Sequence, residues 1–235
     1  MILQRPVLYL SLLAGLVACS DGTDTVPVTP PPEPPPPISI DTPNADRCEM
    51  LDAENCMFPW PSDVFTVADE SLETGRRVNL NQESLPANRR GDRVDPAEWN
   101  RNDGFSPSQM ILAQVPGVDL AQTGAPSISD LAQSLEVDSP VVVIRASTGE
   151  QHLVFAELDA NTDDPAEQTF IIRPMVQFER GERYIVALRN LRDSAGEVLE
   201  APEVFRAFRD DTLTDNADIE ARRPAMDALF STLED

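Results

Sequence analysis

The chain has 235 residues, and its 41 acidic and 18 basic side chains give a formal net charge of -23 at pH 7. A surface this acidic repels the phosphate backbone, so nucleic-acid binding is excluded. Every basic residue is an arginine, and a chain without lysine has neither the lysine of a P-loop nor one that forms a Schiff base.

The N-terminus has the pattern of a bacterial lipoprotein leader. Arg5 precedes an apolar run over residues 6–18, which is shorter than the roughly 20 residues that a membrane-spanning helix needs and is typical of a signal peptide. The run ends in LVAC (16–19), which resembles the lipobox, where diacylglycerol is attached to the cysteine thiol before cleavage. We therefore predict a lipoprotein signal peptide over 1–18 and lipidation at Cys19; the alternative is ordinary secretion with a chance cysteine.

Lipidation at Cys19 defines the expected location. Acyl chains such as palmitate would enter the lipid bilayer, and several chains anchor a protein stably where one does not. Ser20, not Asp, follows the cysteine; in a cell with two membranes, the lipoprotein pattern then indicates the outer one. We expect a lipid-anchored protein of the cell envelope, at the outer membrane or the cell surface.

A proline-rich segment follows. The stretch from Pro27 to Pro37 holds eight prolines in eleven residues, a composition that favours polyproline II with a length of roughly 34 Å. It has no set of apolar residues to bury in a core. We predict a disordered tether over 19–45; the alternative is a ligand for a proline-binding domain.

Two of the three cysteines are available to form a disulfide. If Cys19 carries lipid, Cys48 and Cys56 remain as a pair, and an oxidising compartment lets them bridge. The alternative is a metal site, but the only histidine, His152, is distant in sequence.

From residue 45 to about 110 the chain is irregular, with short apolar pieces between Pro, Asn, Asp and Arg. We predict a loop-rich layer that packs over a sheet, and the alternative is an aromatic ligand site. In both interpretations the large apolar groups are Phe58, Trp60, Phe65 and Trp99.

The rest of the chain is predominantly strand-like. SISDLAQSL (127–135) has helical spacing with a capping serine. After it come strands predicted over 140–147, 152–160, 168–175 and 182–191, with edge pieces at 198–199 and 204–208. Short strands joined by turns, without helical crossovers, predict a mainly β fold and a β-sandwich.

Three segments carry a family resemblance. PMVQFERGERYIVALRNLRDSAGEVL (174–199) resembles the closing strands of bacterial Ig-like domains. With CMFPWPSDVF (56–65) and NDGFSPSQMI (102–111) before it, the order resembles the N-terminal region of bacterial virulence-factor lipases and related surface lipoproteins. The resemblance implies an Ig-like domain over 46–210, followed in the family by an α/β-hydrolase domain. Trp60 and Ser62 replace the family's more usual Phe and Asn.

A helix is predicted over 216–235, with a kink or restart at Pro224. Its apolar stripe either folds back on the sandwich or faces a domain that this chain does not contain. We assign residues 211–235 to a helical linker to that missing domain. The stripe consists of Met226, Leu229, Phe230 and Leu233.

The sequence offers no catalytic residues. Acyl hydrolysis needs a nucleophile, a base and an oxyanion hole, yet G-x-S-x-G is absent, and the nearest match, at residues 104–108, has Pro107 where an N–H would be needed. His152 opens a predicted strand and is interpreted as structural. We expect no esterase activity from this chain and no cofactor.

One acidic loop suggests calcium. In DANTDDPAE (159–167), Asp159, Asn161 and Asp163 match the start of an EF-hand loop, but its later Gly and Glu positions do not match. A looser Ca²⁺ site including Glu167 is one interpretation, and a solvated turn is the other.

Two functions fit these observations. The first is a non-catalytic N-terminal module of a lipase-like surface lipoprotein, with a C-terminal hydrolase domain as its partner. The second is a free-standing surface binding lipoprotein, such as an adhesin or envelope component.

Overall fold

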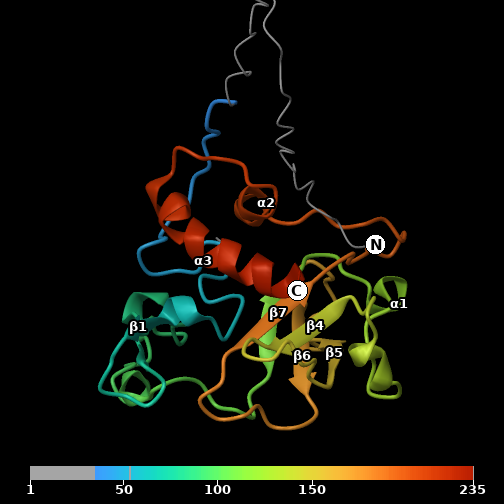
Figure 1. Cartoon of the computed structure of the whole chain (residues 1–235), viewed down its shortest axis with the longest axis horizontal. Coiled ribbons are helices and arrows are strands. Elements are labelled where there is room, and N and C mark those ends of the chain that lie inside the picture. The colour runs from blue at the N-terminus through green and yellow to red at the C-terminus, as the bar shows by residue number, and fades with distance from the viewer. Residues whose placement is uncertain (1–34, 53, 235) are drawn as a thin grey trace, which may run out of the picture. The chain divides into compact units, whose positions relative to one another are not determined.

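A computed structural model of the chain describes residues 35–52 and 54–234. Contacts divide the chain into residues 1–36 and residues 37–235, and every described helix and strand lies in the second unit. Cys19 and most of the predicted tether lie outside the described residues. The described part consists of antiparallel sheets with few helices (Figure 1), so the prediction of a mainly β fold is confirmed.

A three-stranded antiparallel sheet has the order β3-β6-β5. Its strands are β3 (Ile111–Gln114), β6 (Thr169–Pro174) and β5 (Val154–Leu158). Successive side chains of a strand point to opposite faces. One face of this sheet enters the main hydrophobic cluster, to which it contributes Ile111, Val154, Ala156, Phe170 and Ile172. The other face is only partly covered.

A second sheet pairs β4 (Val141–Arg145) with β7 (Tyr184–Leu188). Val141 and Val143 join the main cluster, while Val142 and Ile144 lie in a separate cluster that also contains Leu229. Both faces of β4 are therefore covered. This explains why its sequence is an unbroken apolar run and not an alternating one.

The N-terminal layer has a small core of its own. It contains the hairpin of β1 (Thr66–Ala68) and β2 (Arg76–Val78) and the 3₁₀ turns Asp63–Phe65, Gln82–Ser84 and Trp99–Arg101. Phe65 is buried and Trp60 packs beside it. Trp99, which was expected to pack in this layer, is instead 52% exposed.

The helix expected over 127–135 is not formed as predicted. Only Ala132–Leu135 makes a 3₁₀ turn, and Ser127 forms a β-bridge with Asp130 instead of capping a helix. A short helix that the sequence did not suggest, α1 (Leu120–Thr123), lies just before it and is capped by the side chain of Asp119.

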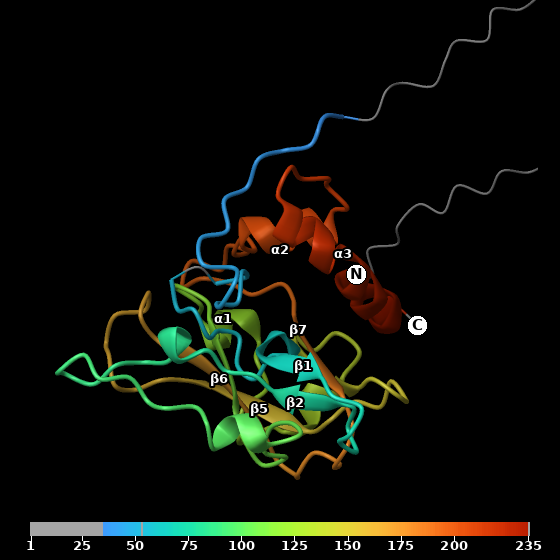
Figure 2. The same cartoon turned by 90° about the vertical axis from the view of Figure 1, so that its left-hand side faces the viewer.

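Two helices end the chain, α2 (Glu203–Arg209) and α3 (Ala217–Glu234). The edge strand expected at 204–208 is wrong, because Val204, Ala207 and Phe208 form one buried helical face. Pro224 lies inside α3, and the helix does not restart there. Figures 1 and 2 show α2 and α3 lying together on one side of the strands.

The apolar stripe of α3 contacts the rest of this chain. Met226 is buried among residues of α2, and Leu229 contacts both that cluster and the β4–β7 sheet. The rings of Phe230 and Phe205 are 5.9 Å apart, whereas Leu233 is 36% exposed. Of the two arrangements expected for this helix, the structure adopts the one that folds back.

The folded unit begins earlier than residue 46. Ile40 is buried against α2 and α3, and Ile38 pairs with Thr214 in a parallel bridge. The side-chain amide of Asn216 donates to the carbonyl oxygen of Ile40 at 2.9 Å. The contact boundary accordingly falls at Pro37, inside the predicted tether.

An ion pair at the start of α3 makes stability depend on pH. Arg223 donates to both carboxylate oxygens of Glu220, at 2.7 and 2.8 Å, and Thr214 donates through its N–H and its hydroxyl. These bonds, chiefly those from Arg223, lower the pKa of Glu220 from 4.5 to about 2.

We expect this carboxylate to stabilise the fold fully above pH 4.5 and to lose its contribution as the pH falls from there to about 2. Because its side chain is 31% exposed, solvent screening limits the contribution to about 1 kcal/mol. Urea unfolding of wild type and Glu220→Gln between pH 7 and pH 2 checks this. The free energies of unfolding of the two proteins should converge as the pH falls toward 2. A constant difference between them at all pH values would contradict the assignment.

Candidate functional site

The predicted disulfide is present. Cys48 and Cys56 are joined with an S–S distance of 2.02 Å. Inside this loop, the N–H of Glu49 donates to the carbonyl oxygen of Cys56 at 2.7 Å. The side chain of Glu49 is fully buried and points away from solvent to Ser62 and Arg222. The loop is therefore tied to α3 as well as to itself.

In the acidic loop the candidate calcium ligands bond within the loop or face solvent. Asp159 Oδ1 accepts hydrogen bonds from the backbone and side-chain nitrogens of Asn161, and Glu167 accepts from Thr162 at 3.4 Å; Asp163 is exposed. No three His, Cys, Asp or Glu side chains in the described ranges gather so that they could hold a metal ion. The loop is a turn closed by its own hydrogen bonds.

Ser106 and His152 are not arranged as a nucleophile and its base. Ser106 is exposed, and its hydroxyl accepts the N–H of Ser108 at 3.3 Å. His152 instead bonds through Nε2 to the carbonyl oxygen of Val176 at 2.9 Å. Its ring packs 4.6 Å from that of Phe178 and 5.5 Å from that of Tyr184, centroid to centroid.

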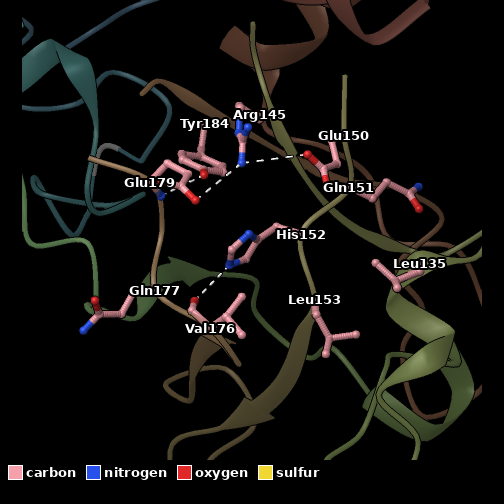
Figure 3. A pocket seen from close by; sticks show the side chains of 10 residues that line it. All are labelled: Leu135, Arg145, Glu150, Gln151, His152, Leu153, Val176, Gln177, Glu179 and Tyr184. Carbon is pink, nitrogen blue, oxygen red and sulfur yellow. Dashed lines mark hydrogen bonds and ion pairs between the residues drawn. The ribbon is translucent and has the colours of Figure 1, made fainter. Parts of the chain in front are cut away.

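His152 lies in a cavity of about 230 Å³ between the turn that follows β4 and the start of β7 (Figure 3). Arg145 lies across the cavity, with Nη2 3.8 Å from a carboxylate oxygen of Glu150 and 4.0 Å from one of Glu179. The pKa of Arg145 is raised above its usual value, chiefly by its hydrogen bond with the side chain of Tyr184.

This cavity has the features of a structural contact. The Tyr184 hydroxyl also accepts the N–H of Glu179 at 3.0 Å, and Arg145 shares its charge between two acids. The residues here that could move a proton, His152, Tyr184, Glu150 and Glu179, each have a partner. Arg145 Nε is buried and has no partner in the described part of the chain. An arginine does not titrate in the physiological range, so it supplies no acid or base.

A larger hollow lies on the partly covered face of the three-stranded sheet. It has a volume of about 410 Å³, within the size range of small-ligand sites. We call it the sheet groove. Its lining comes from the strands and from two loops, and consists of Trp60, Ser108, Gln109, Met110, Leu112, Phe155, Arg173 and Pro174.

The groove is the feature that sequence reasoning did not locate. The sequence offers Trp60 as a possible aromatic ligand residue, but it indicates Phe155 and Arg173 only as parts of strands. Their register brings them directly opposite each other across β5 and β6. The alternation of each strand shows which residues share a face; it does not show which loop covers that face.

No protein-family model, no curated protein and no solved structure matches the chain. Within the described ranges, no helix combines the length and the apolarity that crossing a bilayer requires.

Proposed function

We propose that the chain is a lipid-anchored surface lipoprotein whose folded part is a non-catalytic, Ig-like module of a lipase-like protein. The observation that carries the proposal is the distribution of the three cysteines. Two of them form a disulfide, which persists in oxidising compartments outside the cytosol. The third follows Leu-Val-Ala at the end of the apolar leader. Acyl chains on Cys19 would hold the module in the outer membrane.

The module's role in this proposal is to position a hydrolase domain. The order of the three family-like segments and the pairing of Ser106 and His152 with other groups support a non-catalytic part beside a catalytic one. Sequencing the gene beyond Asp235 tests the partnership. An open reading frame that reaches G-x-S-x-G supports it, and an immediate stop codon favours the second candidate.

The second candidate is a free-standing surface binding lipoprotein. The sheet groove favours it, because a hollow of about 410 Å³ with aromatic and polar lining residues is suited to a ligand.

Labelling cells with a fatty-acid analogue tests the anchor. We expect the wild-type chain to be tagged and Cys19→Ser to be untagged. The double variant Cys48→Ser/Cys56→Ser is the matched control, because it also removes cysteines but leaves the lipobox intact, and it should be tagged like the wild type. Equal labelling of Cys19→Ser and wild type would refute lipidation.

A further inference from the structure

The sheet groove is held in a fixed shape by the sheet. Trp60 and Leu112 exchange two backbone hydrogen bonds, of 2.8 and 2.7 Å. Trp60 is thus paired with β3 in an antiparallel bridge, although it lies in a loop. The indole also packs against two phenyl rings. Its centroid lies 4.9 Å from that of Phe105, in an edge-to-face arrangement, and 5.7 Å from that of Phe65. A site with its aromatic wall already in place loses little entropy on binding.

Hydrogen-bond donors remain unused in the groove. Gln109 Nε2 is buried and has no partner in the described part of the chain. Arg173 uses Nε to bind Glu157 at 2.5 Å, and no bond from its Nη1 or Nη2 to another described residue is present. A buried donor without a partner is destabilising, so a ligand that supplied acceptor oxygens would remove that cost.

Charge narrows the choice of ligand. An anion would have to approach a chain of net charge -23 and share Arg173 with the carboxylate that it already binds. A cation would be repelled by the Arg173 guanidinium in the lining. A pure hydrocarbon would leave Gln109 without a partner.

We propose that the sheet groove binds a neutral saccharide. A sugar ring presents an apolar C–H face to an aromatic wall and hydroxyl oxygens to donors, which is the combination that Trp60, Phe155, Gln109 and Arg173 provide. This site is independent of the lipid anchor and of any hydrolase domain.

Tryptophan fluorescence of the full chain tests the proposal. Trp99→Phe removes the exposed indole and leaves Trp60 as the only reporter. The chain is kept in a polyoxyethylene detergent, since alkyl glycosides would themselves offer a sugar. Titration with cellohexaose, maltohexaose and chitohexaose should give a saturable change for at least one of them, with a Kd of about 0.1–1 mM.

Variants separate binding from folding. Arg173→Met and Gln109→Leu should each weaken binding about tenfold, and Gln109→Leu should unfold at the same or a higher urea concentration because it removes an unpaired donor. Arg206→Met is the matched control: Arg206 is also paired with a glutamate and is 38% exposed, against 40% for Arg173, but it lies on α2. It should bind like the parent.

The proposal fails if none of the three sugars changes the emission up to about 10 mM, or if octanoate saturates the site in their place. The Cys19→Ser variant, which lacks the proposed lipidation site, should bind the sugars as tightly as the parent chain. A result that refutes lipidation therefore leaves the test of sugar binding unaffected, and the two outcomes can be told apart.

Discussion

Arg222→Met is expected to lower the free energy of unfolding by about 3–5 kcal/mol, because it leaves a buried carboxylate without its countercharge. Glu49 is completely buried and Arg222 is 16% exposed. The guanidinium contacts both oxygens of Glu49, one of them at 3.1 Å from Nη2. Ser62 and the N–H of Leu51 add bonds of 2.9 and 3.3 Å. Urea unfolding at pH 7 measures the loss.

Two further variants show whether the buried charge is the cause. Glu49→Gln/Arg222→Met should recover more than half of the loss, since the amide is neutral and can still accept from Ser62. Arg101→Met removes a guanidinium from an exposed pair with Glu98 and should cost less than about 0.5 kcal/mol. If Arg222→Met cost no more than Arg101→Met, the assignment of a buried ion pair would be wrong.

The strands were predictable where the local pattern and the tertiary environment agree. The runs at 140–147, 152–160, 168–175 and 182–191 each contain an observed strand. β3 was missed because four residues give too short a pattern, and its place is set by pairing with Thr169–Ile172, far along the chain.

The errors come from context that short segments do not contain. Val204, Phe205 and Phe208 are β-forming residues, but Ala207 and the buried side of α3 make a helix the better way to bury them. Ser127 had the features of a helix cap, yet it bonds across a turn. Glu49 and Arg222 could not be paired from the sequence, because 173 residues separate them and nothing in the local pattern marks either side chain as buried.

Shortening the chain after Thr212, which removes α3, is expected to cost more than about 5 kcal/mol, comparable to the whole stability of a domain. The deletion exposes Val142, Ile144 and Ile185, which α3 helps to cover through Leu229, and it also removes the partner of Glu49. A helix that only linked two domains would leave stability unchanged when removed. Circular dichroism during urea unfolding should show no cooperative transition for the shortened chain.

A chain that ends at Phe230 is the matched control for that deletion. It retains Met226, Leu229 and Phe230, which make the apolar contacts of α3, and loses a last turn in which Leu233 is 36% exposed. Its free energy of unfolding should match that of the full chain within about 0.5 kcal/mol. A cooperative, unshifted transition after Thr212 would mean that the sheets are stable without the helix, and residues 211–235 would then act as a linker after all.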